Sequence, residues 1–136
     1  MTDQTSYDRR PARRVLIVED DPGARRSLLL LLTGRGFDAV AFPTAARGLA
    51  NAITHPPACL VADYLLIDGD GIALLEAMRA SGWAGPAILI SAYSSRELSD
   101  RAKATGFAVL FEKPLREHAL VDAVGRLVES GEEANP

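Results

Sequence analysis

Short runs of consecutive apolar residues recur along the chain, and turn-forming residues bound each run. A continuous run of roughly four to eight apolar residues indicates a strand covered on both faces, because a half-exposed strand alternates apolar and polar residues. Three such runs and two more mixed segments predict five strands. They span Val15–Val18, Phe37–Phe42, Cys59–Asp63, Ala87–Ile90 and Phe107–Phe111.

The segments between these runs repeat their apolar residues at helical spacing. In the third segment Ile72, Leu75 and Met78 lie on one side of a helix. Asp21 and Thr44 precede the first two segments and are typical N-cap residues. The predicted helices span residues 22–35, 45–53, 71–80, 95–104 and 115–128.

Strands and helices alternate strictly along the chain. This alternation is typical of a parallel sheet whose strands are joined by right-handed crossover helices. The continuous apolar strands support helices on both faces of that sheet. The pattern therefore predicts an α/β fold of the doubly wound (βα)5 type, with one five-stranded parallel sheet.

Polar residues follow four of the five predicted strands. Glu19 and Asp20 follow the first strand, Asp63 ends the third, and Ser91 and Lys113 follow the fourth and fifth. In an open α/β sheet, ligands bind beyond the carboxyl ends of the strands, where the strand order reverses. If these strands are neighbours, carboxylates, a hydroxyl group and an ammonium group converge on one edge.

Carboxylates that lie this close together repel one another, and such a cluster usually needs a divalent cation. Ligation by oxygen atoms alone, from few residues, suits Mg²⁺. A metal ion, an ammonium group and a hydroxyl group together stabilise a transferring phosphoryl group. Since an aspartate carboxylate can act as a nucleophile, we expect Asp63 to accept that group.

With these residues in place, the chain resembles the receiver domains of two-component response regulators. Val15–Asp21 resembles the family's first strand and acidic pair, and Asp63 resembles the phosphorylated aspartate, with Gly71 eight residues later. Ile90–Ala92 resembles the hydroxyl position of strand four, and Phe111–Leu115 resembles the Lys-Pro element. The resemblance covers nearly everything except the tails. It implies the flavodoxin-like strand order 2-1-3-4-5.

The resemblance also implies roles for the acidic residues. Asp20 and Asp63 would bind Mg²⁺ directly, and the backbone carbonyl of Leu65 would add a third protein oxygen. Glu19 would act mostly through water. Asp63 would take the phosphoryl group from a histidine kinase or a histidine phosphotransfer protein.

Two further residues would contact the phosphoryl group. Ser91 would donate a hydrogen bond to it, and Lys113 would pair with its charge. The Lys113–Pro114 bond resembles one that is cis in the family. The family implies no enzymatic activity except phosphorylation of the domain itself and slow autodephosphorylation.

Several positions depart from the family pattern. Ile67 replaces the usual proline, which predicts a more flexible loop, and Leu110 replaces the aromatic residue of the usual switch. Leu65, Ala92 and Tyr93 stand where the family controls access to the phosphoryl group. Because Leu65 and Tyr93 are bulky and not acidic, we expect a phosphorylated form that lasts minutes rather than seconds.

Two surfaces are candidates for partner binding. Leu28–Leu32 sweep every face of the first helix, so either the last helix covers most of them or they form an apolar docking face for a kinase or phosphotransfer protein. A downstream protein would bind the face made by the helix 95–104, the strand 107–111 and the helix 115–128.

Composition excludes other classes of protein. The net charge of -3 gives no tendency to bind nucleic acid directly. No apolar run approaches the roughly 18 residues of a membrane span. Cys59, the single cysteine, fits a reducing cytoplasm. We therefore expect a cytoplasmic protein that does not bind a membrane.

The predicted domain spans residues 13–129, between a disordered basic arm at residues 1–12 and a disordered acidic tail at residues 130–136. No DNA-binding module is evident after Val128, so we expect either a single-domain regulator or the receiver of a truncated transcription factor, and the length of the chain favours the first.

Three other functions remain open at this point. The chain could be a receiver that binds partners without phosphorylation, although its acidic set is intact. It could be a flavodoxin-like cofactor binder, but Glu19–Asp21 would repel a phosphate without metal. A metal-dependent phosphatase would usually have a second acid two residues after its nucleophile, where this chain has Leu65.

Overall fold

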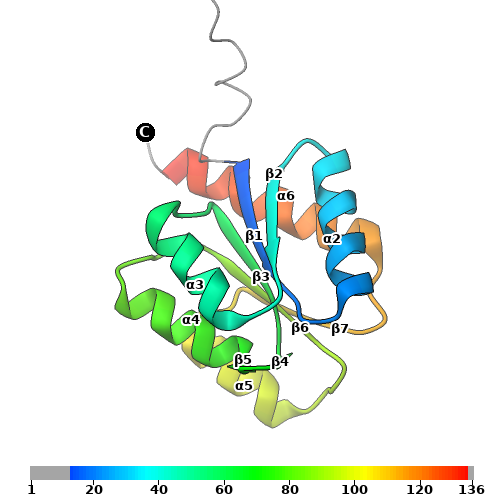
Figure 1. Ribbon diagram of the computed structural model, residues 1–136, viewed down its shortest axis with the longest axis vertical. Helices are drawn as coiled ribbons and strands as arrows, with labels where there is room; N and C mark the ends of the chain where they lie inside the picture. The colour runs from blue at the N-terminus through cyan, green and yellow to red at the C-terminus, as the bar shows by residue number, and fades with distance from the viewer. Residues whose placement is uncertain (1–12, 135–136) are drawn as a thin grey trace, which may run out of the picture.

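The computed structural model describes residues 13–134, and it describes side-chain surroundings for residues 13–130. One parallel five-stranded sheet forms the centre, with the strand order β2-β1-β3-β6-β7 (Figure 1). Counted within this sheet, the order is 2-1-3-4-5, as the resemblance implied. The strands are β1 (Arg14–Val18), β2 (Asp38–Phe42), β3 (Cys59–Asp63), β6 (Ala87–Ser91) and β7 (Val109–Glu112).

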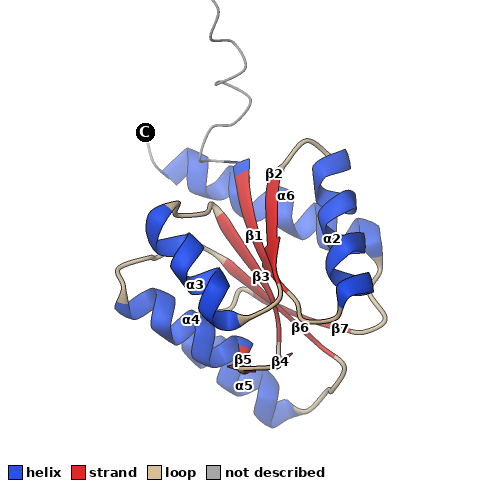
Figure 2. Cartoon of the chain, in the orientation of Figure 1, coloured by secondary structure: helices blue, strands red, loops and turns tan. Residues whose placement is uncertain are grey.

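Five helices cover the two faces of the sheet, which confirms the doubly wound prediction (Figure 2). The helices α2 and α6 pack on one face, and α3, α4 and α5 pack on the other. Their bounds are α2 (Pro22–Gly34), α3 (Ala45–Thr54), α4 (Gly71–Ala80), α5 (Arg96–Thr105) and α6 (Glu117–Ala134).

The continuous apolar strands are explained by two separate cores. Successive residues of a strand point to opposite faces. Leu16 and Val18 of β1 therefore lie in the core under α3, α4 and α5, whereas Val15 and Ile17 lie in the core under α2 and α6. Because both faces are covered, all four buried positions of β1, Val15–Val18, are apolar. The single cysteine, Cys59, is buried in β3, and burial raises the pKa of its thiol to about 12.

The loop after Asp63, which joins β3 to α4, contains a small hairpin that the sequence pattern did not predict. The strands β4 (Leu65–Leu66) and β5 (Gly69–Asp70) pair antiparallel across a two-residue turn. Asp70 then caps α4, since its side chain accepts a hydrogen bond from the N–H of Ala73 at 2.8 Å. Asp21 and Thr44 cap α2 and α3 in the same way, as predicted.

The last helix is longer than predicted. It runs to Ala134, so the predicted tail at residues 130–136 is wrong for residues 130–134. Residues 130–134 contain no proline, and Glu132, Glu133 and Ala134 favour helix, although Gly131 does not. The predicted arm at residues 1–12 and the last two residues of the predicted tail lie outside the described residues. No helix among the described residues is long and apolar enough to cross a membrane.

The leucine run of α2 is mostly structural. Leu28 and Leu32 are buried in the core beside α6, and Leu29 and Leu31 pack against the same core. Leu30 alone is strongly exposed, at 59%. The prediction that packing covers most of these leucines is confirmed, and only Leu30 can be changed without disturbing the core.

Gly71, the first residue of α4, has no room for a side chain. A Cβ atom there would lie 2.6 Å from the backbone oxygen of Asp63 and 2.8 Å from a methyl carbon of Leu89. We expect Gly71→Ala to lower the free energy of unfolding by about 1–3 kcal/mol, because the Asp63 backbone must shift. Chemical denaturation measures this change.

Gly125, inside α6, supplies the matched control. A Cβ atom there meets nothing within 4 Å. Gly125→Ala should therefore raise stability, by up to about 1 kcal/mol, because alanine loses less backbone entropy in a helix. Similar destabilisation by both substitutions would contradict this account of Gly71.

Candidate functional site

The sheet brings the predicted site residues to one edge. β1, β3, β6 and β7 are consecutive neighbours, and their carboxyl ends carry Glu19, Asp63, Ser91 and Lys113. The ladder continues one residue past the strands, since the N–H of Glu19 donates to Phe42 at 3.0 Å and that of Lys113 to Ser91 at 2.8 Å. Backbone hydrogen bonds therefore hold the site residues in place.

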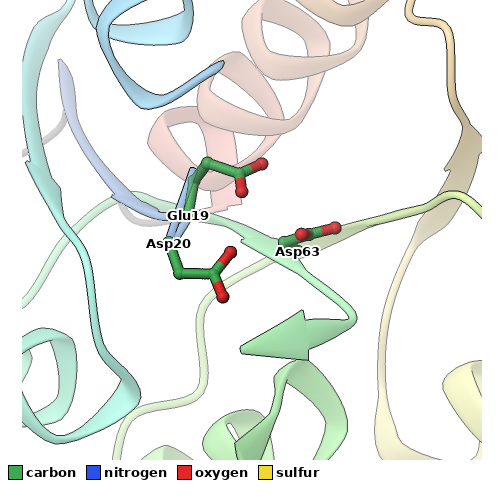
Figure 3. A group of neighbouring side chains, drawn as sticks. All are labelled: Glu19, Asp20 and Asp63. Atoms are coloured by element: carbon green, nitrogen blue, oxygen red, sulfur yellow. The ribbon is translucent and has the colours of Figure 1, made fainter. Parts of the chain in front are cut away.

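Three carboxylates converge at this edge. One carboxylate oxygen from each of Glu19, Asp20 and Asp63 lies within 4.8 Å of the other two, and the three side chains project to the same side (Figure 3). Glu19 is 1% exposed and Asp63 is 8% exposed. Lys113 places its Nζ 3.3 Å from both Glu19 Oε1 and Asp63 Oδ2. The charged residues that the sequence predicted to converge therefore lie together, and Lys113 contacts two of them.

Burial dominates the electrostatics of the cluster. Burial raises the pKa of Asp63, and the charge and hydrogen bond of Lys113 only partly oppose this effect. Burial also raises the pKa of Glu19. For Lys113, burial lowers the pKa, but the charges of Glu19 and Asp63 outweigh it and raise the pKa overall. One ammonium group thus faces three carboxylates, and this excess negative charge fits a divalent cation.

The carboxylates differ in their hydrogen bonds. Glu19 is engaged through both oxygens, since Oε2 accepts the N–H of Asp21 at 3.1 Å and Oε1 pairs with Lys113. Asp63 Oδ1 accepts the N–H of Tyr64 at 3.1 Å. Asp21, a fourth acid at this edge, turns to cap α2 at the N–H of Ala24 and does not join the cluster.

Ser91 lies beside Asp63, at the end of the next strand, and is 1% exposed. Its Oγ accepts the N–H of Tyr93 at 2.9 Å. This bond uses an oxygen lone pair, so the hydroxyl proton stays available for donation. The backbone that follows β6 therefore orients the buried hydroxyl group of Ser91.

The residues predicted to control access lie at the surface. Leu65 is 49% exposed and Tyr93 is 59% exposed, and Ala92 between Ser91 and Tyr93 is also exposed. Leu110, at the switch position, is half-buried and packs against the core beneath α5. It lines a groove of about 300 Å³ between α5 and β7.

Two features of the site were not found from the sequence. Arg25 of α2 donates from Nη1 to the backbone oxygen of Glu19 at 3.0 Å and to that of Asp20 at 3.3 Å, which fixes the acidic turn. An apolar groove of about 520 Å³ between α2 and the start of α6 reaches Glu19 and Lys113. The leucines of α2 were a candidate docking face in the sequence, but the groove itself forms only where α2 and the segment after β7 come together. The Arg25 contacts have no sequence signal.

Known proteins match this chain in sequence and in fold. The model of the response regulator receiver domain matches residues 15–125. The chain belongs to this family. The Lys113–Pro114 bond of this receiver is cis, as the resemblance implied. Within two-component signalling, receiver domains are the part of a response regulator that accepts the signal.

Individual relatives agree with this assignment. The receiver is 31% identical, over 83% of its length, to transcriptional regulatory protein TdiR of Thauera aromatica, of which it covers 50%. It is 41% identical, over 66% of its length, to KDP operon transcriptional regulatory protein KdpE of Escherichia coli K12, of which it covers 39%. The chain thus spans half or less of these curated relatives.

Solved structures show the same architecture. A CheY-like response regulator receiver domain protein from Methanospirillum hungatei superposes with a TM-score of 0.85 at 25% identity, and the match covers 90% of this chain and 98% of that one. A sensor protein from Polaromonas superposes with a TM-score of 0.77 at 30% identity, over 87% and 97% of the two chains.

Proposed function

We propose that this receiver takes a phosphoryl group onto Asp63, with Mg²⁺, from a histidine kinase or a histidine phosphotransfer protein. The observation that carries the proposal is the convergence of Glu19, Asp20 and Asp63 within 4.8 Å at the carboxyl edge of the sheet. Phosphorylation then changes the binding of a downstream protein. The receiver catalyses no reaction other than its own phosphorylation and slow autodephosphorylation.

In the transfer, a carboxylate oxygen of Asp63 attacks the phosphorus of the phosphohistidine. An O–P bond forms, the N–P bond breaks, and the bonding electron pair stays on the imidazole nitrogen. Lys113, which now lies 3.3 Å from Asp63, pairs with the charge of the arriving group, and the hydroxyl proton of Ser91 is positioned to donate to it.

The metal site in this proposal uses Asp20, Asp63 and the carbonyl oxygen of Leu65 as direct ligands. Glu19 acts through water, which fits the engagement of both its oxygens. Bound Mg²⁺ supplies positive charge that offsets the repulsion between the carboxylates and the phosphoryl oxygens. The excess of three carboxylates over one ammonium group supports this role.

The donor protein docks, in this proposal, on the apolar groove between α2 and the start of α6. Leu28 and Leu31 line this groove, which ends at Glu19 and Lys113 and so leads to the site. A helix of the donor fits a groove of this kind. The downstream protein binds the face formed by α5, β7 and α6. The exchange takes place in the cytoplasm, which agrees with the free thiol of Cys59.

The test is phosphorylation of the purified protein by acetyl phosphate. With Mg²⁺, the intact mass should increase by one phosphoryl group, and peptide mapping after borohydride reduction should place the group on Asp63. Removal of Mg²⁺ with EDTA should abolish the reaction. No mass increase, or modification at another residue, would overturn the proposal and favour a receiver that binds partners without phosphorylation.

We expect the phosphorylated form to persist for minutes or longer. Leu65 and Tyr93 are exposed at the site and offer no carboxylate to activate water. The measurement is loss of label from purified phosphoprotein over time. Leu65→Asn should shorten the half-life, because its amide can hydrogen-bond an attacking water. Loss within seconds from the unchanged protein would contradict the prediction.

A further inference from the structure

Asp68 makes a contact that reaches far along the sequence. It lies on the turn between β4 and β5, five residues after Asp63. Its Oδ1 accepts the backbone N–H of Ala45 at 2.8 Å, and its Oδ2 accepts that of Ala46 at 3.0 Å. Both donors open α3, so the carboxylate ties the tip of the hairpin to a different helix.

The helix end does not depend on Asp68 alone. Thr44 already caps α3, since its hydroxyl oxygen accepts the N–H of Arg47 at 3.2 Å. Asp68 satisfies the two N–H groups before that one, which would otherwise lack an intrahelical partner. Its negative charge also suits the positive end of the helix. These bonds lower the pKa of Asp68, so the carboxylate is ionised at neutral pH.

The other contacts of the loop hold its base rather than its tip. The N–H of Gly71 donates to the carbonyl of Tyr64 at 2.8 Å, and Leu66 is buried in the core. Ile67, at the tip, is 78% exposed and has little apolar surface to pack against. The tip also lacks a proline, whose fixed φ would stiffen the turn. Leu66 anchors one side of the turn, and Asp68 is the turn residue whose side chain bonds to another element.

We propose that Asp68 is a positioning residue for the metal site, which it serves by clamping the β4–β5 hairpin to α3. The hairpin carries Leu65, which pairs with Asp70 in the β4–β5 ladder. The clamp fixes the direction of the Leu65 carbonyl and so supplies the rigidity that a proline at position 67 would otherwise give. The inference rests on the proposed function, because it takes this carbonyl as a Mg²⁺ ligand.

The experiment compares Mg²⁺ binding in four variants, followed by the amide NMR signals of the loop after Asp63. Asp68→Ala should weaken Mg²⁺ binding about 10-fold, as expected when a group that orients a ligand is removed. At saturating Mg²⁺, its rate of phosphorylation by acetyl phosphate should return to near that of the unchanged protein. Asp68→Asn keeps one acceptor oxygen, so its affinity for Mg²⁺ should lie between that of Asp68→Ala and that of the unchanged protein.

Thr44→Ala is the matched control. It removes a hydrogen bond from the same end of α3 but leaves the hairpin contact intact. It should lower the Tm without changing Mg²⁺ binding. Equal loss of Mg²⁺ binding in Thr44→Ala and Asp68→Ala would show that Asp68 merely caps the helix, and would overturn the proposal.

Ile67→Pro tests the clamp by rescue. No residue of the described chain other than glycine has a positive φ, so Ile67 has a negative φ, the sign that the proline ring imposes. Ile67→Pro combined with Asp68→Ala should restore most of the lost Mg²⁺ binding. Failure to restore it, in a variant that is folded by its Tm, would count against the clamp.

The two proposals fail in different ways. If the protein binds Mg²⁺ but Asp63 is not phosphorylated, the proposed function is wrong, and the comparison of Mg²⁺ binding among the variants still decides the role of Asp68. If Asp63 is phosphorylated and Asp68→Ala binds Mg²⁺ as tightly as the unchanged protein, only the clamp is wrong. If the protein binds no Mg²⁺, both are overturned.

Discussion

Asp63→Asn is expected to abolish Mg²⁺-dependent phosphorylation by acetyl phosphate, with a loss of at least about 100-fold. The amide has the size of the carboxylate but neither its negative charge nor its nucleophilic oxygen. It also removes one of the three carboxylates that lie within 4.8 Å of one another, so Mg²⁺ binding should weaken as well. Intact-mass spectrometry of the variant measures the first effect, and Mg²⁺ titration measures the second.

Asp70→Asn is the matched control for this variant. Asp70 lies in the same loop, but its side chain caps α4 at the N–H of Ala73, a role that asparagine fills equally well. Phosphorylation of Asp70→Asn should match that of the unchanged protein. Full phosphorylation of Asp63→Asn at another residue would contradict the assignment of the acceptor.

The same Asp63→Asn change should raise the Tm in the absence of Mg²⁺. The pKa of Asp63 is raised in the folded protein by burial, so the ionised carboxylate costs stability at neutral pH. This cost disappears as the pH falls through the raised pKa and the carboxyl group is protonated in the folded state. The gain in Tm should therefore be present at neutral pH and shrink in acid.

Lys113→Ala is expected to produce the second large effect, a decrease of roughly 10–100-fold in the rate of phosphorylation. The Nζ atom lies 3.3 Å from Asp63, so its removal deprives the arriving phosphoryl group of the nearest positive side chain. The same removal leaves Glu19, which is 1% exposed, without the cation that pairs with it. Both effects follow from one contact.

Stability should fall in this variant, in contrast to Asp63→Asn. An unpaired buried carboxylate costs several kcal/mol, but Lys113 is about one-third exposed, so water screens part of the pair. We expect Lys113→Ala to lower the free energy of unfolding by about 1–2 kcal/mol, measured by chemical denaturation without Mg²⁺. Lys113→Arg keeps the charge and should recover most of the stability.

These opposite signs make the pair of variants informative. If both lower the Tm, the carboxylates are not in excess over the ammonium group, and the electrostatic argument for a divalent cation loses its support. A double variant, Asp63→Asn with Lys113→Ala, should lose less stability than Lys113→Ala alone, because only Glu19 and Asp20 then remain in the cluster.

The sequence alone determined the α/β alternation, the buried strands and the residues at their carboxyl ends. Hydrophobic periodicity and helix capping are local properties, so the sequence shows them directly. Once the strands are parallel, their carboxyl ends share one edge, which carries Glu19, Asp63, Ser91 and Lys113. It misjudged the end of α6, where a charged stretch fits a helix as well as a tail.

Only the tertiary structure decided which remote residues hold the site in place. Arg25 of α2 donates to the backbone oxygens of Glu19 and Asp20, although no sequence pattern marks it as part of the site. Asp68 reads as an ordinary turn residue, but it bonds to α3 across more than 20 positions. Such contacts depend on how the helices pack on the sheet. The sequence pattern reports only local periodicity, so it does not show which remote segments come close together.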